Sequence, residues 1–151
     1  MIKTTIAVAL AALALTGCMT AAEKQAEADS ITRLEAQLAI ARQAAAVPCP
    51  DTPTCDRAWM LTKNYVEQNS EMRVRRSDDA SIETYLPIHS GMVSFDAKRV
   101  PVKGGGMVIT LAGICMNMYE SGGTPGANYI QCATKIGIPQ KKFRGYLEAN
   151  L

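Results

Sequence analysis

The chain has 151 residues and a formal net charge of +2, from 16 lysines and arginines against 14 aspartates and glutamates. Domains that bind nucleic acid usually carry a strong basic excess, and a segment held on a membrane surface by charge needs a basic cluster. The near-neutral composition therefore argues against both functions. Beyond the alanine-rich N-terminal part, about 100 residues remain, from Pro48 to Leu151, which suits one small domain with a modest core.

The first residues have the composition of a secretory signal. Lys3 precedes an apolar run of alanine, valine and leucine from Ile6 to Leu15, and small residues then lead to Cys18. The run is shorter than the roughly 20 residues that a membrane-spanning helix needs. We therefore expect export of the chain, and not a permanent transmembrane helix.

The residues Leu15-Thr16-Gly17-Cys18 resemble the lipobox of bacterial lipoproteins. The resemblance covers only residues 1–18 and implies a signal peptide over residues 1–17, a diacylglyceryl thioether on Cys18 and an acylated amino group after cleavage. Met19 follows the cysteine, and lipoproteins without aspartate at that place are commonly sorted to the outer membrane. The alternative is an ordinary signal peptide in which the cysteine is a coincidence.

Four cysteines remain if Cys18 is lipidated: Cys49, Cys55, Cys115 and Cys132. An even number in an oxidising compartment favours disulfides, and four cysteines allow three pairings. The short separation favours Cys49–Cys55, which leaves Cys115–Cys132. A four-thiolate zinc site is the alternative, but neither pair has the close spacing of zinc knuckles and ribbons.

Residues 18–47 are predicted to form a lipid-anchored helical stalk. Thr20 and Glu23 fit a capping box at its start, and alanine, glutamate, glutamine and arginine favour a helix thereafter. Apolar residues recur at steps of three and four and form a heptad seam: Ile31, Leu34, Leu38, Ala41 and Ala45. The seam has few large residues, so a semi-rigid stalk is a better interpretation than an oligomerisation zipper.

The remaining residues, 48–151, are predicted to form a small disulfide-tied α+β domain. Thr52 and Pro53 begin a helix that continues to about Asn69 and places Trp59 in the core. Alternating residues then predict four strands, and apolar faces at helical spacing predict two final helices, the second beginning at Pro139. The predicted strands are 72–75, 81–88, 92–102 and 107–118, with a bulge near Arg99 to Pro101 and a glycine turn at 104–106.

The fold class is therefore α+β, a mostly antiparallel sheet of about four strands. Helices from both ends of the chain cover one face of this sheet, and the helical stalk precedes it. The last strand has valine, isoleucine and leucine on both faces, so it should be central.

Four basic residues are candidates for an anion- or partner-binding site. Arg73 and Arg75 share a strand, and Lys98 and Arg99 come from the next hairpin. If the strands are neighbours, these residues form one patch that suits lipid phosphate, a glycan or an acidic partner. The alternative is that the charges only protect an exposed strand from aggregation.

Candidates for catalysis are few. His89 is the single histidine and falls in a predicted turn, so a serine triad would have to be built around it. Asp78, Asp79 and Glu83 form an acidic cluster without the spacing of a calcium loop, and a solvated turn explains them more simply. We expect no metal and no cofactor other than the lipid on Cys18, and we expect that the protein is not an enzyme.

These observations favour a non-catalytic envelope lipoprotein whose periplasmic domain binds a protein partner or an envelope polymer. The lipid would anchor the protein to the membrane, and nucleic acid is not an expected partner. A second hypothesis is an inhibitor or exclusion lipoprotein that acts on a lytic enzyme or on phage entry. A hydrolase is the least favoured alternative.

Overall fold

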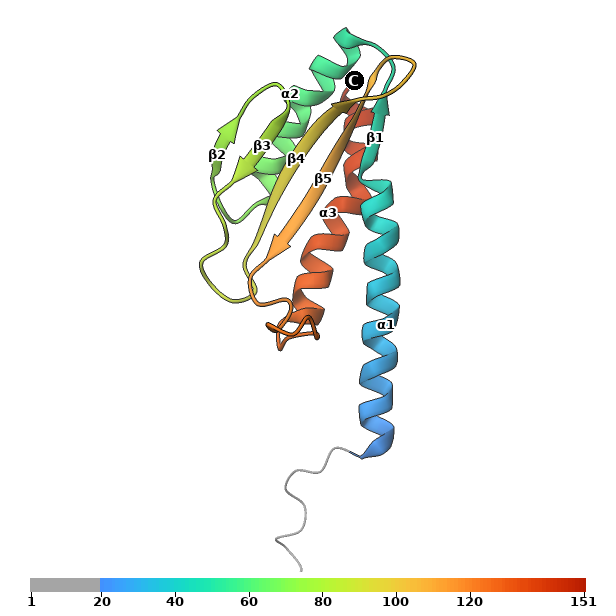
Figure 1. Ribbon diagram of the computed structural model, residues 1–151, viewed down its shortest axis with the longest axis vertical. Helices are drawn as coiled ribbons and strands as arrows, with labels where there is room; N and C mark the ends of the chain where they lie inside the picture. The colour runs from blue at the N-terminus through green and yellow to red at the C-terminus, as the bar shows by residue number, and fades with distance from the viewer. Residues whose placement is uncertain (1–19) are drawn as a thin grey trace, which may run out of the picture. The chain divides into compact units, whose positions relative to one another are not determined.

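The computed structural model describes residues 20–151, so the lipobox and Cys18 lie outside the described residues. The chain divides into two compact units, Met1–Ser30 and Ile31–Leu151. In chain order the elements are α1 (Ala21–Ala44), β1 (Ala46–Cys49), α2 (Thr52–Asn69), β2 (Val74–Ser77), β3 (Ser81–Thr84), β4 (Val93–Pro101), β5 (Met107–Cys115) and α3 (Tyr129–Asn150) (Figure 1).

The strands form one antiparallel sheet in the order β1-β5-β4-β3-β2. Helices from both ends of the chain accompany it, so the predicted α+β class is confirmed. The most apolar strand, β5, lies inside the sheet between β1 and β4, but the central strand is β4 and not β5 as predicted.

The sheet has one strand more than the four predicted. β1 pairs with β5 from Ala46↔Thr110 to Cys49↔Met107, although Pro48 lies within it. Proline lacks an amide donor and is tolerated only on an edge strand, which is the position of β1. The Arg144 side chain also donates to the Ala46 carbonyl, at 2.9 Å. The prolines predicted the end of the preceding helix but concealed this short edge strand.

The core lies between one face of the sheet and the helices α2 and α3, which are on the same side of it in Figure 1. Val93, Phe95 and Ala97 alternate along β4 and are buried, as are Ile109 and Leu111 on β5. Such alternation is expected of a sheet with one covered face. The predicted bulge near Arg99 is wrong, because β4 and β5 keep one register from Val93↔Cys115 to Pro101↔Met107.

Two predicted C-terminal helices are a single helix, α3, with Pro139 inside it. Proline in a helix interior removes one hydrogen bond and disfavours the helix. Buried side chains on both sides of the proline compensate, including Ile136 and Phe143. The Tyr65 hydroxyl on α2 also donates to the Pro139 carbonyl at 2.8 Å. Tertiary packing therefore overrides the local signal for a break.

The helix α2 begins at Thr52, as predicted, and its N-cap is Asp51. The Asp51 carboxylate accepts a hydrogen bond from the Thr54 amide at 2.9 Å, and proline follows in the first turn. Trp59 is buried, as predicted, and its indole N–H donates to the Asp78 carbonyl at 2.9 Å. This hydrogen bond joins α2 to the turn between β2 and β3.

The predicted capping box at the start of α1 is confirmed. The Glu23 amide donates to Thr20 Oγ1 at 3.2 Å, and the Thr20 amide donates to the Glu23 carboxylate at 2.6 Å. From Ile31 onward the heptad seam packs on the chain's own core, with Leu38 and Ala45 fully within it. Within residues 20–151, no helix combines the length and apolar character needed to cross a membrane.

Both predicted disulfides are present, Cys49–Cys55 and Cys115–Cys132. The first closes the loop between β1 and α2. The second joins the end of β5 to the first turns of α3, so each disulfide connects two different elements of the domain.

Loss of the Cys115–Cys132 disulfide should destabilise the domain more than loss of Cys49–Cys55. The sequence separations are 17 and 6 residues, and chain entropy assigns about 3 and about 2 kcal/mol to loops of these lengths. Urea unfolding of the paired Cys→Ser variants measures the difference. An equal or larger loss for the shorter loop would contradict the entropic ranking.

Candidate functional site

The sheet separates the four predicted basic residues into two groups. Arg73 lies just before the edge strand β2 and Arg75 lies within it, whereas Lys98 and Arg99 lie on β4. Strand β3 is placed between β2 and β4. The condition for one continuous patch, that the two strands be neighbours, is therefore not met.

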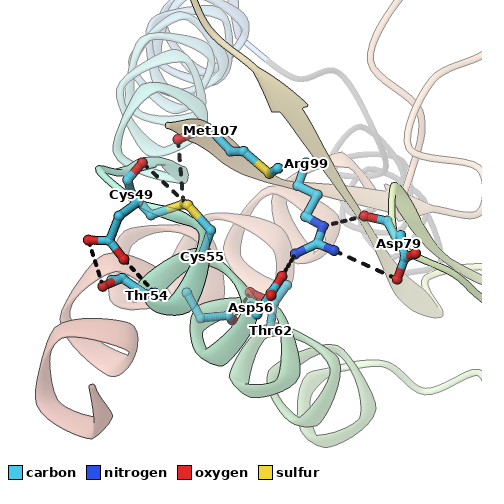
Figure 2. Close-up of a disulfide and its surroundings, with 10 residues drawn as sticks. Cys49, Thr54, Cys55, Asp56, Thr62, Asp79, Arg99 and Met107 are labelled. Carbon is cyan, nitrogen blue, oxygen red and sulfur yellow. Dashed lines mark hydrogen bonds and ion pairs between the residues drawn. A yellow bond between two sulfur atoms is a disulfide. The ribbon is translucent and has the colours of Figure 1, made fainter. Parts of the chain in front are cut away.

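Arg99 joins β4 to α2 and to the turn between β2 and β3. Its guanidinium lies 2.7 Å from the Asp56 carboxylate on α2 and 3.7 Å from the Asp79 carboxylate, and it donates to the Asp79 carbonyl (Figure 2). The same group stacks over the Trp59 ring, 5.3 Å from its centroid. Only 10% of the side chain is exposed, so Arg99 is occupied by contacts within the chain.

Lys98 points to the opposite face of β4 and is exposed. It stands across from Ser81 on β3 and Thr110 on β5, and among residues 20–151 its side chain forms no ion pair. Its neighbours on the adjacent strands are thus hydroxyl side chains and not the arginines of β2.

Arg73 and Arg75 line a groove of about 650 Å³ beside β2. This volume is within the range typical of ligand sites. The groove is bounded by the chain around the start of β2 and by the segment that leaves β3, with one carboxylate from β4. Its lining residues are Met72, Arg73, Arg75, Thr84, Tyr85, Leu86, Ile88 and Asp96; we call it the Arg73 groove.

Three large apolar side chains of this groove are exposed. Tyr85 is 51% exposed, and Leu86 and Ile88 are each 68% exposed. Pro87 between them is buried and therefore anchors the segment. Adjacent exposed apolar side chains rimmed by polar residues are typical of an interaction surface.

Most charges around the groove are already paired. Arg75 lies 2.6 Å from the Glu83 carboxylate, and Arg76 lies 3.2 Å from Glu83 and 3.2 Å from Asp78. Asp96 accepts two hydrogen bonds from Thr84, from the amide at 2.7 Å and the hydroxyl at 3.0 Å. Arg73 differs, because among residues 20–151 it has no carboxylate partner.

The acidic cluster proposed from the sequence is also engaged in contacts within the chain. The Asp78 carboxylate accepts from the Ala80 and Ser81 amides, at 2.9 and 2.8 Å, and these hydrogen bonds lower the pKa of Asp78. Asp79 holds Arg99, and Glu83 holds the arginines of β2. Within residues 20–151, no three histidine, cysteine or acidic side chains are placed to hold a metal ion.

The chain matches no protein-family model, and no curated protein or solved structure is significantly similar to it. The candidate site is therefore defined by the geometry of this chain alone. Of the predicted site residues, the structure brings together Arg73 and Arg75 but not Lys98 and Arg99. It adds Tyr85, Leu86 and Ile88, which the sequence had placed in a strand.

Replacing Arg99 with glutamine should lower the free energy of unfolding by about 1–2 kcal/mol. The change removes a cation–π contact and charge-assisted hydrogen bonds, whose partly exposed carboxylate partners limit the loss. Urea denaturation provides the measurement. Arg73→Gln is the matched control and should stay within about 0.5 kcal/mol of the parent; equal losses in both variants would show that Arg99 has no special structural role.

Proposed function

We propose that the protein is a lipid-anchored envelope lipoprotein whose domain binds a partner without catalysis, through the Arg73 groove. The observation that carries the proposal is the position of Arg73, which has no carboxylate partner among residues 20–151, beside three exposed apolar side chains in one groove. A charged group next to apolar surface favours a specific contact, since the apolar side chains supply affinity and the charge fixes orientation.

The proposed location follows from the N-terminal residues. Cys18 is the attachment point for lipid in this proposal, and Met19 favours the outer membrane with the domain in the periplasm. Two disulfides suit an oxidising compartment of this kind. The alanine- and glutamate-rich helical segment before Ile31 is the proposed link between the lipid and the domain.

Cys18→Ala should leave the N-terminal signal uncleaved by the lipoprotein-specific peptidase. Stable anchoring requires two or more acyl chains, because a single chain binds membranes only reversibly, and the cysteine would be the site that receives them. Mass spectrometry of the N-terminal peptide tests the parent and the variant. An unmodified cysteine at the N-terminus of the mature parent would refute the anchor.

Partner binding is tested by placing a photo-crosslinking amino acid at position 86 of the full chain in its native envelope. We expect a discrete adduct from position 86 that is lost when Arg73→Gln is added. Position 60 is the matched control, because Met60 on α2 is 65% exposed and Leu86 is 68% exposed. If positions 86 and 60 give the same adducts, or position 86 gives none, the groove does not bind a partner.

A further inference from the structure

We propose that the occupant of the Arg73 groove is a short segment of another protein that presents a carboxylate next to apolar side chains. This inference rests on the proposed function, since it assumes that the groove takes a partner, and it specifies the chemistry of that partner. It is carried by the pairing of charges around the groove and by the direction in which its side chains face.

The carboxylate is assigned to Arg73. Arg75 is held by Glu83, and Asp96 accepts hydrogen bonds from Thr84, so Arg73 is the cation of the groove that has no carboxylate partner within residues 20–151. An arginine side chain offers a planar fork of donors that matches a carboxylate. One carboxylate on the ligand would therefore give Arg73 an ion-pair partner.

The apolar part is assigned to Tyr85, Leu86 and Ile88. The Tyr85 amide donates to the Arg73 carbonyl at 3.0 Å, which continues the pairing of Val74 with Thr84 by one residue. Residues directly opposite each other in an antiparallel pair lie on the same face. The Tyr85 ring and the Arg73 guanidinium consequently line the same groove, and a ligand that pairs with Arg73 brings its adjacent side chains onto the apolar wall.

Side chains, and not backbone pairing with β2, should make the contact. β2 has four residues, and its pairing with β3 shifts register between Val74 and Arg76. A short edge strand with an irregularity and charged side chains disfavours the addition of another strand. The ligand segment is therefore expected to lie in the groove without extending the sheet.

The charge balance also favours a protein segment over a bilayer. Binding to anionic lipid depends on a basic cluster with an excess of positive charge. Here Arg75 and Arg76 are offset by Glu83 and Asp78, and Asp96 contributes a carboxylate to the groove itself. Within residues 20–151 Arg73 alone of these arginines lacks a carboxylate partner, which suits one carboxylate at a defined position. A surface of many phosphates would also meet the acidic side chains.

The test is selection from a random peptide library against the immobilised full chain purified in detergent. Selected peptides should contain aspartate or glutamate within two positions of leucine, isoleucine or phenylalanine. Arg73→Gln and Leu86→Ser should each weaken their binding by about tenfold, which is typical for loss of a charge-assisted hydrogen bond or a buried leucine. Lys142→Gln and Met60→Ser are the exposed controls and should change binding by less than about twofold.

Three outcomes would overturn the inference: no enrichment, enriched peptides without an acidic residue, or binding unaffected by the groove variants. Vesicles of phosphatidylglycerol and phosphatidylcholine test the bilayer. The lipid anchor would insert into vesicles of either composition, so the parent and Arg73→Gln are compared on the same vesicles. A lower retention of Arg73→Gln on phosphatidylglycerol vesicles would assign the groove to lipid. Failure of the photo-crosslink at position 86 refutes the proposed function, whereas a crosslink without selection of acidic peptides refutes only this inference.

Discussion

The close alignment of α3 along β5 is the constraint on which the rest of the domain depends. Three contacts fix it: Gln140 donates to the Leu111 carbonyl at 3.0 Å, Ile136 packs over Gly113, and Cys132 is bonded to Cys115. A side chain at Gly113 would place its Cβ 2.7 Å from Ile136, so only glycine permits this approach. The two elements run in opposite directions, and each contact lies two residues from the next on the strand and four on the helix.

The spacing of these contacts along the strand matches their spacing along the helix. Two residues of a strand advance about 6.6 Å and four residues of a helix about 6 Å, so the three contacts can form together without distortion of either element. The arrangement explains why α3 continues through Pro139, because Gln140 lies just beyond the proline and is fixed by the sheet. It also creates the surface on which the part of α1 from Ile31 onward packs, with Leu38 lying against Gly137.

The architecture could be predicted from the sequence because it depends on periodic patterns. Alternation identified the strands, helical spacing placed Trp59 in the core, and the cysteine count with loop length gave both disulfides. Arg99 could also have been found, since it continues the buried alternation of Val93, Phe95 and Ala97; the assumed bulge interrupted this alternation at Arg99. The Arg73 groove could not be found in this way, because it exists only where the chain leaves β3 after Thr84 and exposes Leu86 and Ile88.

Both edges of the sheet are closed to further strands. On one side Pro48 lacks an amide donor and the Ala46 carbonyl is occupied by Arg144; on the other, β2 is short, irregular and rich in arginine. Proteins confined to a membrane by lipid share a thin layer, in which neighbouring copies meet far more often than in free solution. If the domain is anchored as proposed, sheet edges that accept no further strand would prevent neighbouring copies from pairing edge to edge, even when they are crowded at the membrane.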